Sequence, residues 1–210
     1  MNLDHAIISN KYRITGMIGE GGISEVYRAV DIISGNDRIA LKVLKKNRTT
    51  SRIEDVIRFQ GEAAIASHLT HPHIVSVFDV GSLSGLHYLC MEFIDGMSLA
   101  ELLRNGSTFT PAEAVDIVAQ VARALEHIHR SKIIHRDLKP GNIMISRDGP
   151  DGAPIARIID FGLAQIKEFG AITDPDEIAG TFSYMSPEQS GVIKRPVDER
   201  SDLYSLGIIF

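Results

Sequence analysis

The sequence predicts an α+β fold in two lobes, an antiparallel sheet with one helix followed by a mainly helical part. In the N-terminal part, short segments rich in β-branched and aromatic residues predict strands at 12–18, 25–30, 38–44, 74–80 and 86–93. Residues 52–69 interrupt them with apolar residues at helical spacing, a pattern that ends before Pro72. Helical patterns dominate after Gly96. We therefore expect two lobes, 12–94 and 95–210, joined near Gly96.

The clearest helix signal lies in the second lobe. Thr110-Pro111-Ala112-Glu113 offers an N-cap hydroxyl, a proline at the first helical position and a reciprocal glutamate at the third. An apolar stripe follows at Val118, Val121, Ala122, Leu125 and Ile128, which predicts a long helix packed on a core. Two strand-like runs, residues 143–145 and 155–159, flank the turn-rich segment 147–152 and predict a hairpin.

Composition narrows the class of protein. The chain has 210 residues, of which 44% are hydrophobic and 23% charged, as in ordinary globular domains. A net charge of −5 argues against nucleic-acid binding through bulk electrostatics. Cys90 is the single cysteine, which excludes an intramolecular disulfide and fits a reducing compartment. No apolar run reaches the roughly eighteen residues of a membrane span, so we expect a cytoplasmic location and no membrane segment.

A glycine-rich segment links the first two predicted strands. It reads Ile18-Gly19-Glu20-Gly21-Gly22-Ile23-Ser24-Glu25-Val26. Glycines without Cβ atoms let backbone N–H groups approach a phosphate closely, although a plain hairpin turn explains the same residues. A dinucleotide-binding loop is less favoured, because such a loop leads into a helix and this one leads into a strand.

A lysine, Lys42, lies in the otherwise apolar strand segment 38–44. The simplest interpretation is a lysine whose stem packs while its ammonium reaches water. Glu62 on the following predicted helix offers a carboxylate partner, and a buried ammonium requires one. Such a pair could hold the lysine against phosphate groups.

Four polar residues at the two ends of the predicted hairpin carry the strongest chemical signal. Asp137, Lys139 and Asn142 lie between apolar segments, and Asp160 follows the second strand of the predicted hairpin. The hairpin brings Asn142 and Asp160 together, and their oxygens are the ligand type that Mg²⁺ prefers. Asp137 can accept a proton from an incoming hydroxyl, and Lys139 can neutralise charge on a phosphoryl group in transfer. A turn-forming role is the alternative for any single aspartate.

These motifs together resemble the eukaryotic type of Ser/Thr protein kinase, and more closely its bacterial branch. The resemblance runs over residues 12–210 and rests on the glycine-rich loop, Lys42, Glu62, His135-Arg136-Asp137 with Asn142, Asp160-Phe161-Gly162, and Ser186-Pro187-Glu188 in place of Ala-Pro-Glu. Ser24, where a third glycine often stands, and Ser186 depart from the pattern by small residues. The resemblance implies a protein-kinase-like fold with an incomplete second lobe, ATP and Mg²⁺ as cofactors, and a protein substrate with a Ser or Thr acceptor.

The resemblance also implies roles for individual residues. Asp137 and Lys139 are catalytic, Asn142 and Asp160 bind the metal, and Arg136, Thr173 and Thr181 are regulatory. The ATP site comprises Ile18, Gly19, Glu20, Gly21, Gly22, Ile23, Ser24, Glu25, Val26, Ala40, Lys42, Glu62, Met91, Glu92 and Ile94. Met91 guards the rear of the adenine pocket, and the backbone of residues 92–94 binds the adenine edge. Asp202 resembles the buried carboxylate that holds the catalytic loop from below.

Two competing functions remain. A nucleotide-binding pseudokinase or inactive fragment would signal by conformation, although intact Lys42, Asp137 and Asp160 argue against it; a small-molecule kinase of the same fold is opposed by Lys139-Pro140 and residues 180–188. The chain stops within the apolar run 206–210. We therefore expect it to be part of a longer signalling protein.

Overall fold

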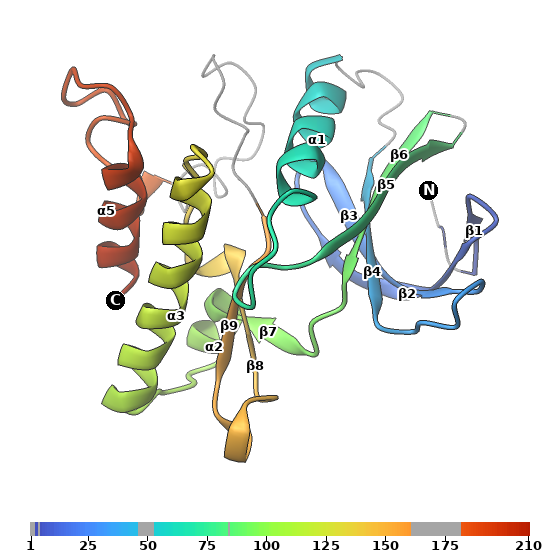
Figure 1. Cartoon of the computed structure of the whole chain (residues 1–210), viewed down its shortest axis with the longest axis horizontal. Coiled ribbons are helices and arrows are strands. Elements are labelled where there is room, and N and C mark those ends of the chain that lie inside the picture. The colour runs from blue at the N-terminus through green and yellow to red at the C-terminus, as the bar shows by residue number, and fades with distance from the viewer. Residues whose placement is uncertain (1–2, 4, 46–52, 84, 161–181) are drawn as a thin grey trace. The chain divides into compact units, whose positions relative to one another are not determined.

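The computed structural model describes residues 3, 5–45, 53–83, 85–160 and 182–210 (Figure 1). The chain forms two compact units, Met1–His68 with Ser76–Ile94 and Leu69–Val75 with Asp95–Phe210. Each unit is described by itself.

The first unit contains an antiparallel sheet and one helix. The strands are β1 (Ile7–Ile8), β2 (Tyr12–Glu20), β3 (Ser24–Asp31), β4 (Ile39–Leu44), β5 (Val77–Leu83) and β6 (Leu86–Glu92), in the order β1-β2-β3-β4-β6-β5. Helix α1 (Ile53–Ala66) lies beside β5 and β6 (Figure 1). The central strand β4 is buried along its whole length, which agrees with the apolar residues on both sides of Lys42.

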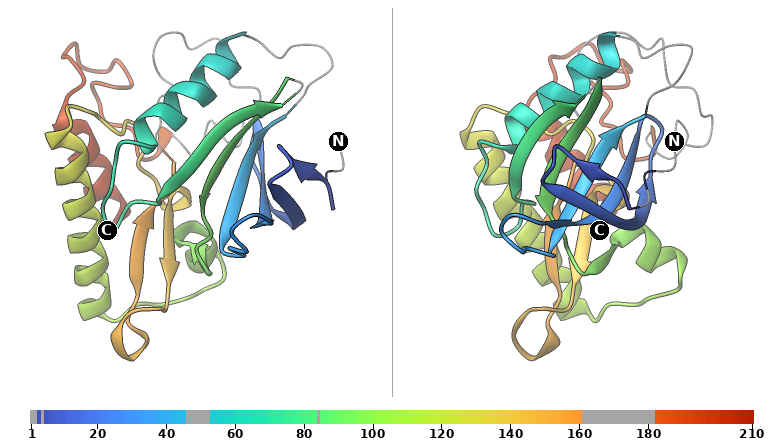
Figure 2. Two further views of the ribbon diagram at one scale, coloured as in Figure 1. Left: turned by 45° about the vertical axis from the view of Figure 1, so that its right-hand side comes forward. Right: turned by 90° about the vertical axis from the view of Figure 1, so that its right-hand side faces the viewer.

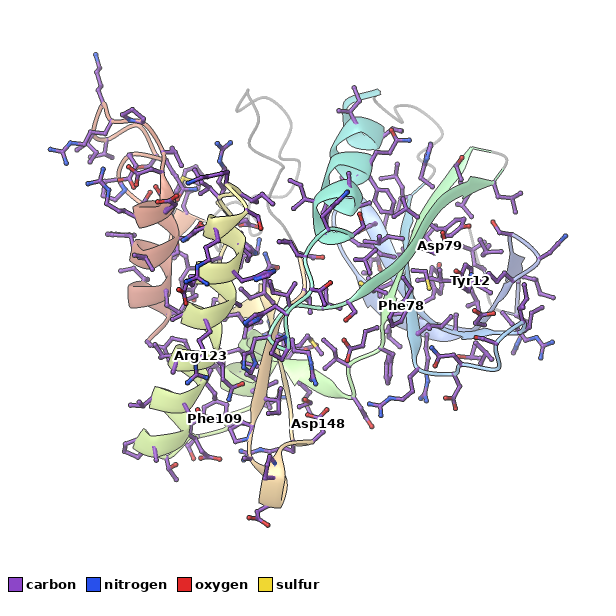
Figure 3. The ribbon with its side chains drawn as sticks, in the orientation of Figure 1. Tyr12, Phe78, Asp79, Phe109, Arg123 and Asp148 are labelled. Carbon is purple, nitrogen blue, oxygen red and sulfur yellow. The ribbon has the colours of Figure 1, made fainter. Side chains whose placement is uncertain are left out.

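Both faces of this sheet are covered by apolar side chains. On the helix side, Leu44 and Leu89 pack against Phe59 and Ala63 of α1. The other face holds a larger cluster, comprising Ile8, Tyr12, Ile14, Tyr27, Ala29, Ile39, Leu41, Val43, Tyr88 and Cys90. The Tyr12 hydroxyl at the edge of this cluster donates to Asp79 Oδ2 at 2.7 Å (Figure 3), so its polar group is satisfied despite burial.

The second unit combines helices with a small antiparallel sheet. Its elements are β7 (Gly96–Ser98), α2 (Leu99–Arg104), α3 (Pro111–Arg130), the 3₁₀ turn η1 (Pro140–Asn142), β8 (Ile143–Ser146), η2 (Pro150–Gly152), β9 (Ile155–Ile158) and α5 (Glu199–Ile209). The strands pair in the order β7-β8-β9, and α3 runs alongside β9 (Figure 2). The predicted hairpin at 143–159 is therefore confirmed.

The start of α3 is the one its sequence predicts. The Thr110 side chain accepts a hydrogen bond from Glu113 N, the Glu113 carboxylate accepts from Thr110 N, and Pro111 occupies the first helical position. Ile117, Val121, Ala124, Leu125 and Ile128 form its buried face. This packing fixes the C-terminal end of α3, from which the loop with Asp137 emerges.

Several predicted boundaries are wrong. Strand β5 begins at Val77 instead of Ile74, because Ile74 bridges Ile158 and Val75 N donates to Ile158 O in the second unit. Helix α1 ends at Ala66 instead of Leu69, where Ser67 Oγ and His68 Nδ1 both bond the Ala64 carbonyl. The structure also contains β1, β7 and α2, which are absent from the predicted elements.

Candidate active site

The register of β3, β4 and β6 gathers several predicted ATP-site residues in the first unit. Lys42 on β4 pairs with Val26 on β3 and Leu89 on β6, and Ala40 pairs with Met91. Because side chains alternate along a strand, Ala40 and Lys42 share the face that packs against α1. Ala40, Lys42 and Met91 are all buried.

The predicted pair between Lys42 and Glu62 is confirmed. Lys42 Nζ lies 2.7 Å from Glu62 Oε1, and the exposed fractions of the two side chains are 9% and 17%. Since both groups have little access to water, each charge depends on the other for compensation. The pair fixes the direction of the ammonium relative to the sheet.

The glycine-rich segment forms the hairpin between β2 and β3. Glu20 pairs with Glu25, and Gly21 N donates to Ser24 O at 2.8 Å. Ile18 and Ile23 are half-exposed, at 50% and 42%. A short loop of this kind, with few side chains at its tip, leaves backbone groups accessible to a ligand.

The backbone after β6 is partly committed to internal hydrogen bonds. Glu92 N donates to Ser76 O and Phe93 N donates to Arg38 O. The adenine contacts predicted for residues 92–94 would therefore use other backbone groups of that segment. Ile94 itself is buried.

In the second unit, the buried Asp202 carboxylate holds the backbone of the loop that carries Asp137, the contact that its resemblance implies. Its side chain on α5 is 1% exposed and accepts hydrogen bonds from His135 N at 2.9 Å and Arg136 N at 2.8 Å. His129 on α3 lies 2.7 Å from the same carboxylate through Nε2. Three hydrogen bonds satisfy this buried charge and fix the loop backbone before Asp137.

Asp137, Lys139 and Asn142 form one cluster. Lys139 Nζ lies 3.0 Å from Asp137 Oδ2, and Asn142 Nδ2 donates to Asp137 O at 2.8 Å and to Asp137 Oδ2 at 3.1 Å. These bonds use the amide nitrogen of Asn142, which leaves its oxygen as the atom to offer a cation. Ile159 N donates to Asn142 O at 3.1 Å, so the residue before Asp160 lies beside Asn142.

His135 supports this loop as a neutral ring. Burial lowers the pKa of His135 from its ordinary value of 6.5, against the opposing effect of the Asp202 and Asp137 carboxylates. Its Nδ1 accepts a hydrogen bond from Asp137 N at 3.3 Å, which requires an unprotonated nitrogen. The ring therefore fixes the backbone of the residue that carries the candidate base.

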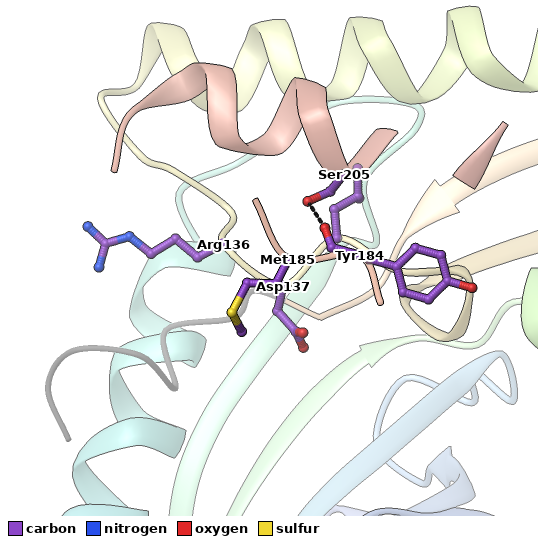
Figure 4. A pocket seen from close by; sticks show the side chains of 6 residues that line it. Arg136, Asp137, Tyr184, Met185 and Ser205 are labelled. Atoms are coloured by element: carbon purple, nitrogen blue, oxygen red, sulfur yellow. Dashed lines mark hydrogen bonds between the residues drawn. The ribbon is translucent and has the colours of Figure 1, made fainter. Parts of the chain in front are cut away.

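A small pocket opens beside Asp137 in the same unit (Figure 4). Its lining comprises Arg136, Asp137, Leu138, Tyr184, Met185 and Ser205. Ser205 Oγ donates to Tyr184 O at 2.7 Å and so anchors residues 184–185 to α5. Met185 and Ser205 are not among the predicted site residues, because neither belongs to a sequence motif that would mark it as functional. Thr173, Thr181, Phe161 and Gly162 lie outside the described residues.

Comparison with known proteins decides the family. A family model described as the protein kinase domain matches residues 12–210. The chain belongs to the protein kinase family. The kinase domain also matches a solved structure, the Mycobacterium tuberculosis PknI kinase domain, with a TM-score of 0.72 at 28% identity over 98% of this chain and 74% of that chain.

Two curated relatives of this kinase domain are bacterial serine/threonine-protein kinases. It is 37% identical to serine/threonine-protein kinase PrkC of Bacillus subtilis over 96% of this chain, and 38% identical to serine/threonine-protein kinase PknB of Mycobacterium leprae, also over 96%. The chain spans 30% and 32% of the length of these two relatives.

Within the part of the chain that the structure describes, no helix combines the length and apolarity needed to cross a bilayer.

Proposed function

We propose that this domain is an ATP- and Mg²⁺-dependent protein kinase that transfers the γ-phosphoryl group to Ser or Thr hydroxyls. The observation that carries the proposal is the cluster of Asp137, Lys139 and Asn142 on a loop that Asp202 anchors. The Asp137 carboxylate is held in place next to the Lys139 ammonium and a small pocket, which suits proton transfer from a bound hydroxyl.

In this mechanism each side chain has a limited task. Asp137 accepts the proton of the substrate hydroxyl as the hydroxyl oxygen bonds to the γ-phosphorus, the bond from that phosphorus to the bridging oxygen breaks and ADP leaves. Lys139 stabilises negative charge on the transferred phosphoryl oxygens. Lys42, directed by Glu62, and the backbone of the glycine-rich hairpin hold the phosphates of ATP. Positioning and electrostatic stabilisation account for most of the catalysis in reactions of this class.

The donor set fits magnesium. Asn142 would contribute an amide oxygen and Asp160 a carboxylate, while ATP phosphates and water would complete the hard-oxygen environment that Mg²⁺ prefers. Bound there, Mg²⁺ would neutralise charge on the phosphates. The hydrogen bonds from Asn142 Nδ2 to Asp137 support this assignment, because they direct the amide oxygen away from the carboxylate of the base.

Phosphoryl transfer by the full-length protein tests the proposal. The protein is incubated with γ-labelled ATP, Mg²⁺ and a generic basic protein, and labelled residues are mapped by mass spectrometry. We expect label on Ser and Thr and its loss when EDTA is added. Nucleotide binding without transfer, under conditions where the protein is folded, would favour a pseudokinase instead. Label on a small molecule alone would favour a small-molecule kinase of the same fold.

A further inference from the structure

The backbone just before the candidate base is strained. Arg136 has φ of +66°, in the left-handed region that side-chain-bearing residues rarely adopt. Such a conformation persists only when surrounding contacts hold it. Asp202 provides one contact through Arg136 N, as described above.

Gln189 provides a second contact, on the carbonyl side of Arg136. Its Nε2 donates to Arg136 O at 2.7 Å, and its Oε1 accepts from Ser186 Oγ at 3.0 Å and Ser186 N at 3.3 Å. Because a carbonyl can only accept and a backbone N–H can only donate, the two ends of the amide are assigned without ambiguity. Gln189 is 8% exposed and Ser186 is fully buried, so water competes little for these bonds.

These contacts fix one complete peptide plane. The carbonyl of Arg136 and the N–H of Asp137 belong to the same planar group. Gln189 binds its oxygen, and His135 Nδ1 accepts from its N–H. The orientation of this plane sets the direction in which the Asp137 side chain leaves the backbone.

Gln189 also links this plane to the segment that lines the pocket. It follows Tyr184 and Met185, which line the pocket together with Asp137 (Figure 4). Ser186 lies between the pocket residues and Gln189 in the chain and orients the Gln189 amide. A change in this segment can therefore reach the backbone of the base through the Gln189 side chain.

We propose that Gln189 is a positioning residue for phosphoryl transfer, which holds the peptide between Arg136 and Asp137 and couples residues 184–189 to the catalytic base. This role rests on the proposed kinase activity. Gln189 itself lies just outside the motif Ser186-Pro187-Glu188 and belongs to none of the motifs named in the sequence.

A second buried glutamine supplies the matched control. Gln120 on α3 is 4% exposed, its Nε2 donates to Pro154 O at 3.0 Å, and its Oε1 accepts from Ala156 N at 2.8 Å. It makes the same kinds of bonds to the backbone, but its partners are Ala156 of β9 and Pro154, the residue before β9. Loss of Gln120 tests the cost of removing a buried amide without touching the catalytic loop.

Steady-state kinetics of the full-length kinase compare Gln189→Met, Gln189→Glu and Gln120→Met. Methionine preserves length but makes neither bond, whereas an ionised glutamate still accepts from Ser186 and cannot donate to Arg136 O. We expect both Gln189 variants to lower kcat roughly five- to a hundredfold, the scale for an unsatisfied buried polar group. The KM for ATP should change little, and Gln120→Met should keep the wild-type kcat even where its Tm falls.

The Gln189→Glu variant adds a readout that a purely structural role would not move. Once protonated, the introduced carboxyl group regains a donor for Arg136 O, so the kcat of this variant relative to wild type should rise as the pH falls. If Gln189→Met does not fold, Gln189→Glu alone decides. A Gln189→Glu enzyme with wild-type kcat at neutral pH, or an equal loss of kcat in Gln120→Met, would overturn the proposal.

Hydrogen exchange separates this proposal from the proposed activity. In the absence of ATP, amides of residues 135–138 should exchange faster in Gln189→Glu than in wild type or Gln120→Met. Unchanged exchange there would contradict the positioning role. If the wild-type protein transfers no phosphate but this difference is present, the proposed function fails while the structural coupling stands.

Discussion

Lys42 on β4 and Glu62 on α1 form an ion pair of 2.7 Å within the first unit. The ammonium cannot turn toward solvent without losing this ion pair in a largely buried site. This constraint gives Lys42 a fixed direction and makes its contribution testable by substitution.

Lys42→Met should lower phosphoryl transfer by roughly 10²-fold, the scale for a misplaced reacting group. Methionine keeps most of the apolar stem, so the loss reflects the missing charge and the lost ion pair with Glu62. The measurement is kcat/KM for ATP in the full-length kinase. Lys11→Met is the control, because Lys11 Nζ lies 3.9 Å from Asp31 and 3.8 Å from Asp79 in the same unit, away from Lys42. Equal activity of Lys42→Met and wild type would contradict the role.

Asp137→Asn should remove most phosphoryl transfer and leave ATP affinity nearly unchanged. The amide cannot accept the proton of the substrate hydroxyl, and loss of a positioned general base costs roughly 10²–10⁴-fold in rate. Single-turnover kinetics and nucleotide titration measure the two effects separately. Asp151→Asn in the exposed turn η2 is the matched control, and Asn tolerates its φ of +54°. Wild-type turnover by the Asp137 variant would refute the assignment of the base.

The sequence predicted those parts of the fold whose signals are local. The cap at Thr110 and Glu113 and the turn between β8 and β9 involve neighbouring residues, and both are present. Helix α2 carries the same kind of cap, since Ser98 and Glu101 form a capping box, so its start also has a local signal in the sequence. Strands β1 and β7 have only two and three residues, so only their pairing partners define them.

The candidate site divides in the same way. Lys42, Asp137 and Asn142 belong to ordered motifs that resemblance can recognise, and their contacts follow from the fold. Gln189 has no such signal, because its importance depends on a hydrogen bond to Arg136, 53 residues away in the chain. Contacts of this kind become visible only when the tertiary structure brings the two segments together.

Thr110→Ala should destabilise the second unit by roughly 0.5–2 kcal/mol, the usual cost of losing an N-cap. The substitution removes the hydroxyl that accepts from Glu113 N at 3.2 Å. Urea unfolding of the full-length protein measures the change as a shift in midpoint. Thr108→Ala replaces an exposed threonine outside the helix and should leave the midpoint unchanged. A cap role is excluded if both variants unfold at the same urea concentration.

Thr173 is expected to carry phosphate in the active protein. It is the single hydroxyl residue between Gly162 and Gly180, and phosphorylation would add roughly −1.5 to −2 charge that Arg136 can bind. Asp174, Asp176 and Glu177 oppose this by repulsion, or themselves supply negative charge to Arg136. Mass spectrometry of an active preparation tests the expectation, and absence of phosphate on Thr173 would contradict it.

A double-variant comparison of Thr173 and Arg136 tests whether the Arg136 side chain binds that phosphate. Thr173→Ala should lower activity in the wild-type background and cause no further loss in an Arg136→Gln background, because the partner of the phosphate is then already absent. Equal proportional losses in the two backgrounds would show that the residues act independently.

Stability should fall as the pH is lowered through the range in which histidine titrates. Burial lowers the pKa of His71, His73 and His135 from the ordinary value of 6.5. For His71, the neighbouring His73, His127 and Arg123 also contribute, and its ring stacks on that of His127 with centroids 5.3 Å apart. For His73, Arg123 and Arg157 lower the pKa further, whereas its bond to Ala156 O and the Asp116 carboxylate raise it.

The sign follows from proton linkage. Below about pH 6.5 the unfolded chain binds protons at these positions that the folded protein does not, so the free energy of unfolding decreases as the pH falls. Above that pH their contribution is fully present. Denaturation at several values from about pH 7.5 to about pH 5.5 measures the slope, a range that lies above the ordinary pKa of 4.5 of the glutamates. His71→Asn should flatten this slope, because asparagine cannot take up a proton in this pH range. A slope that is the same in His71→Asn and the wild-type protein would show that His71 does not contribute to acid sensitivity.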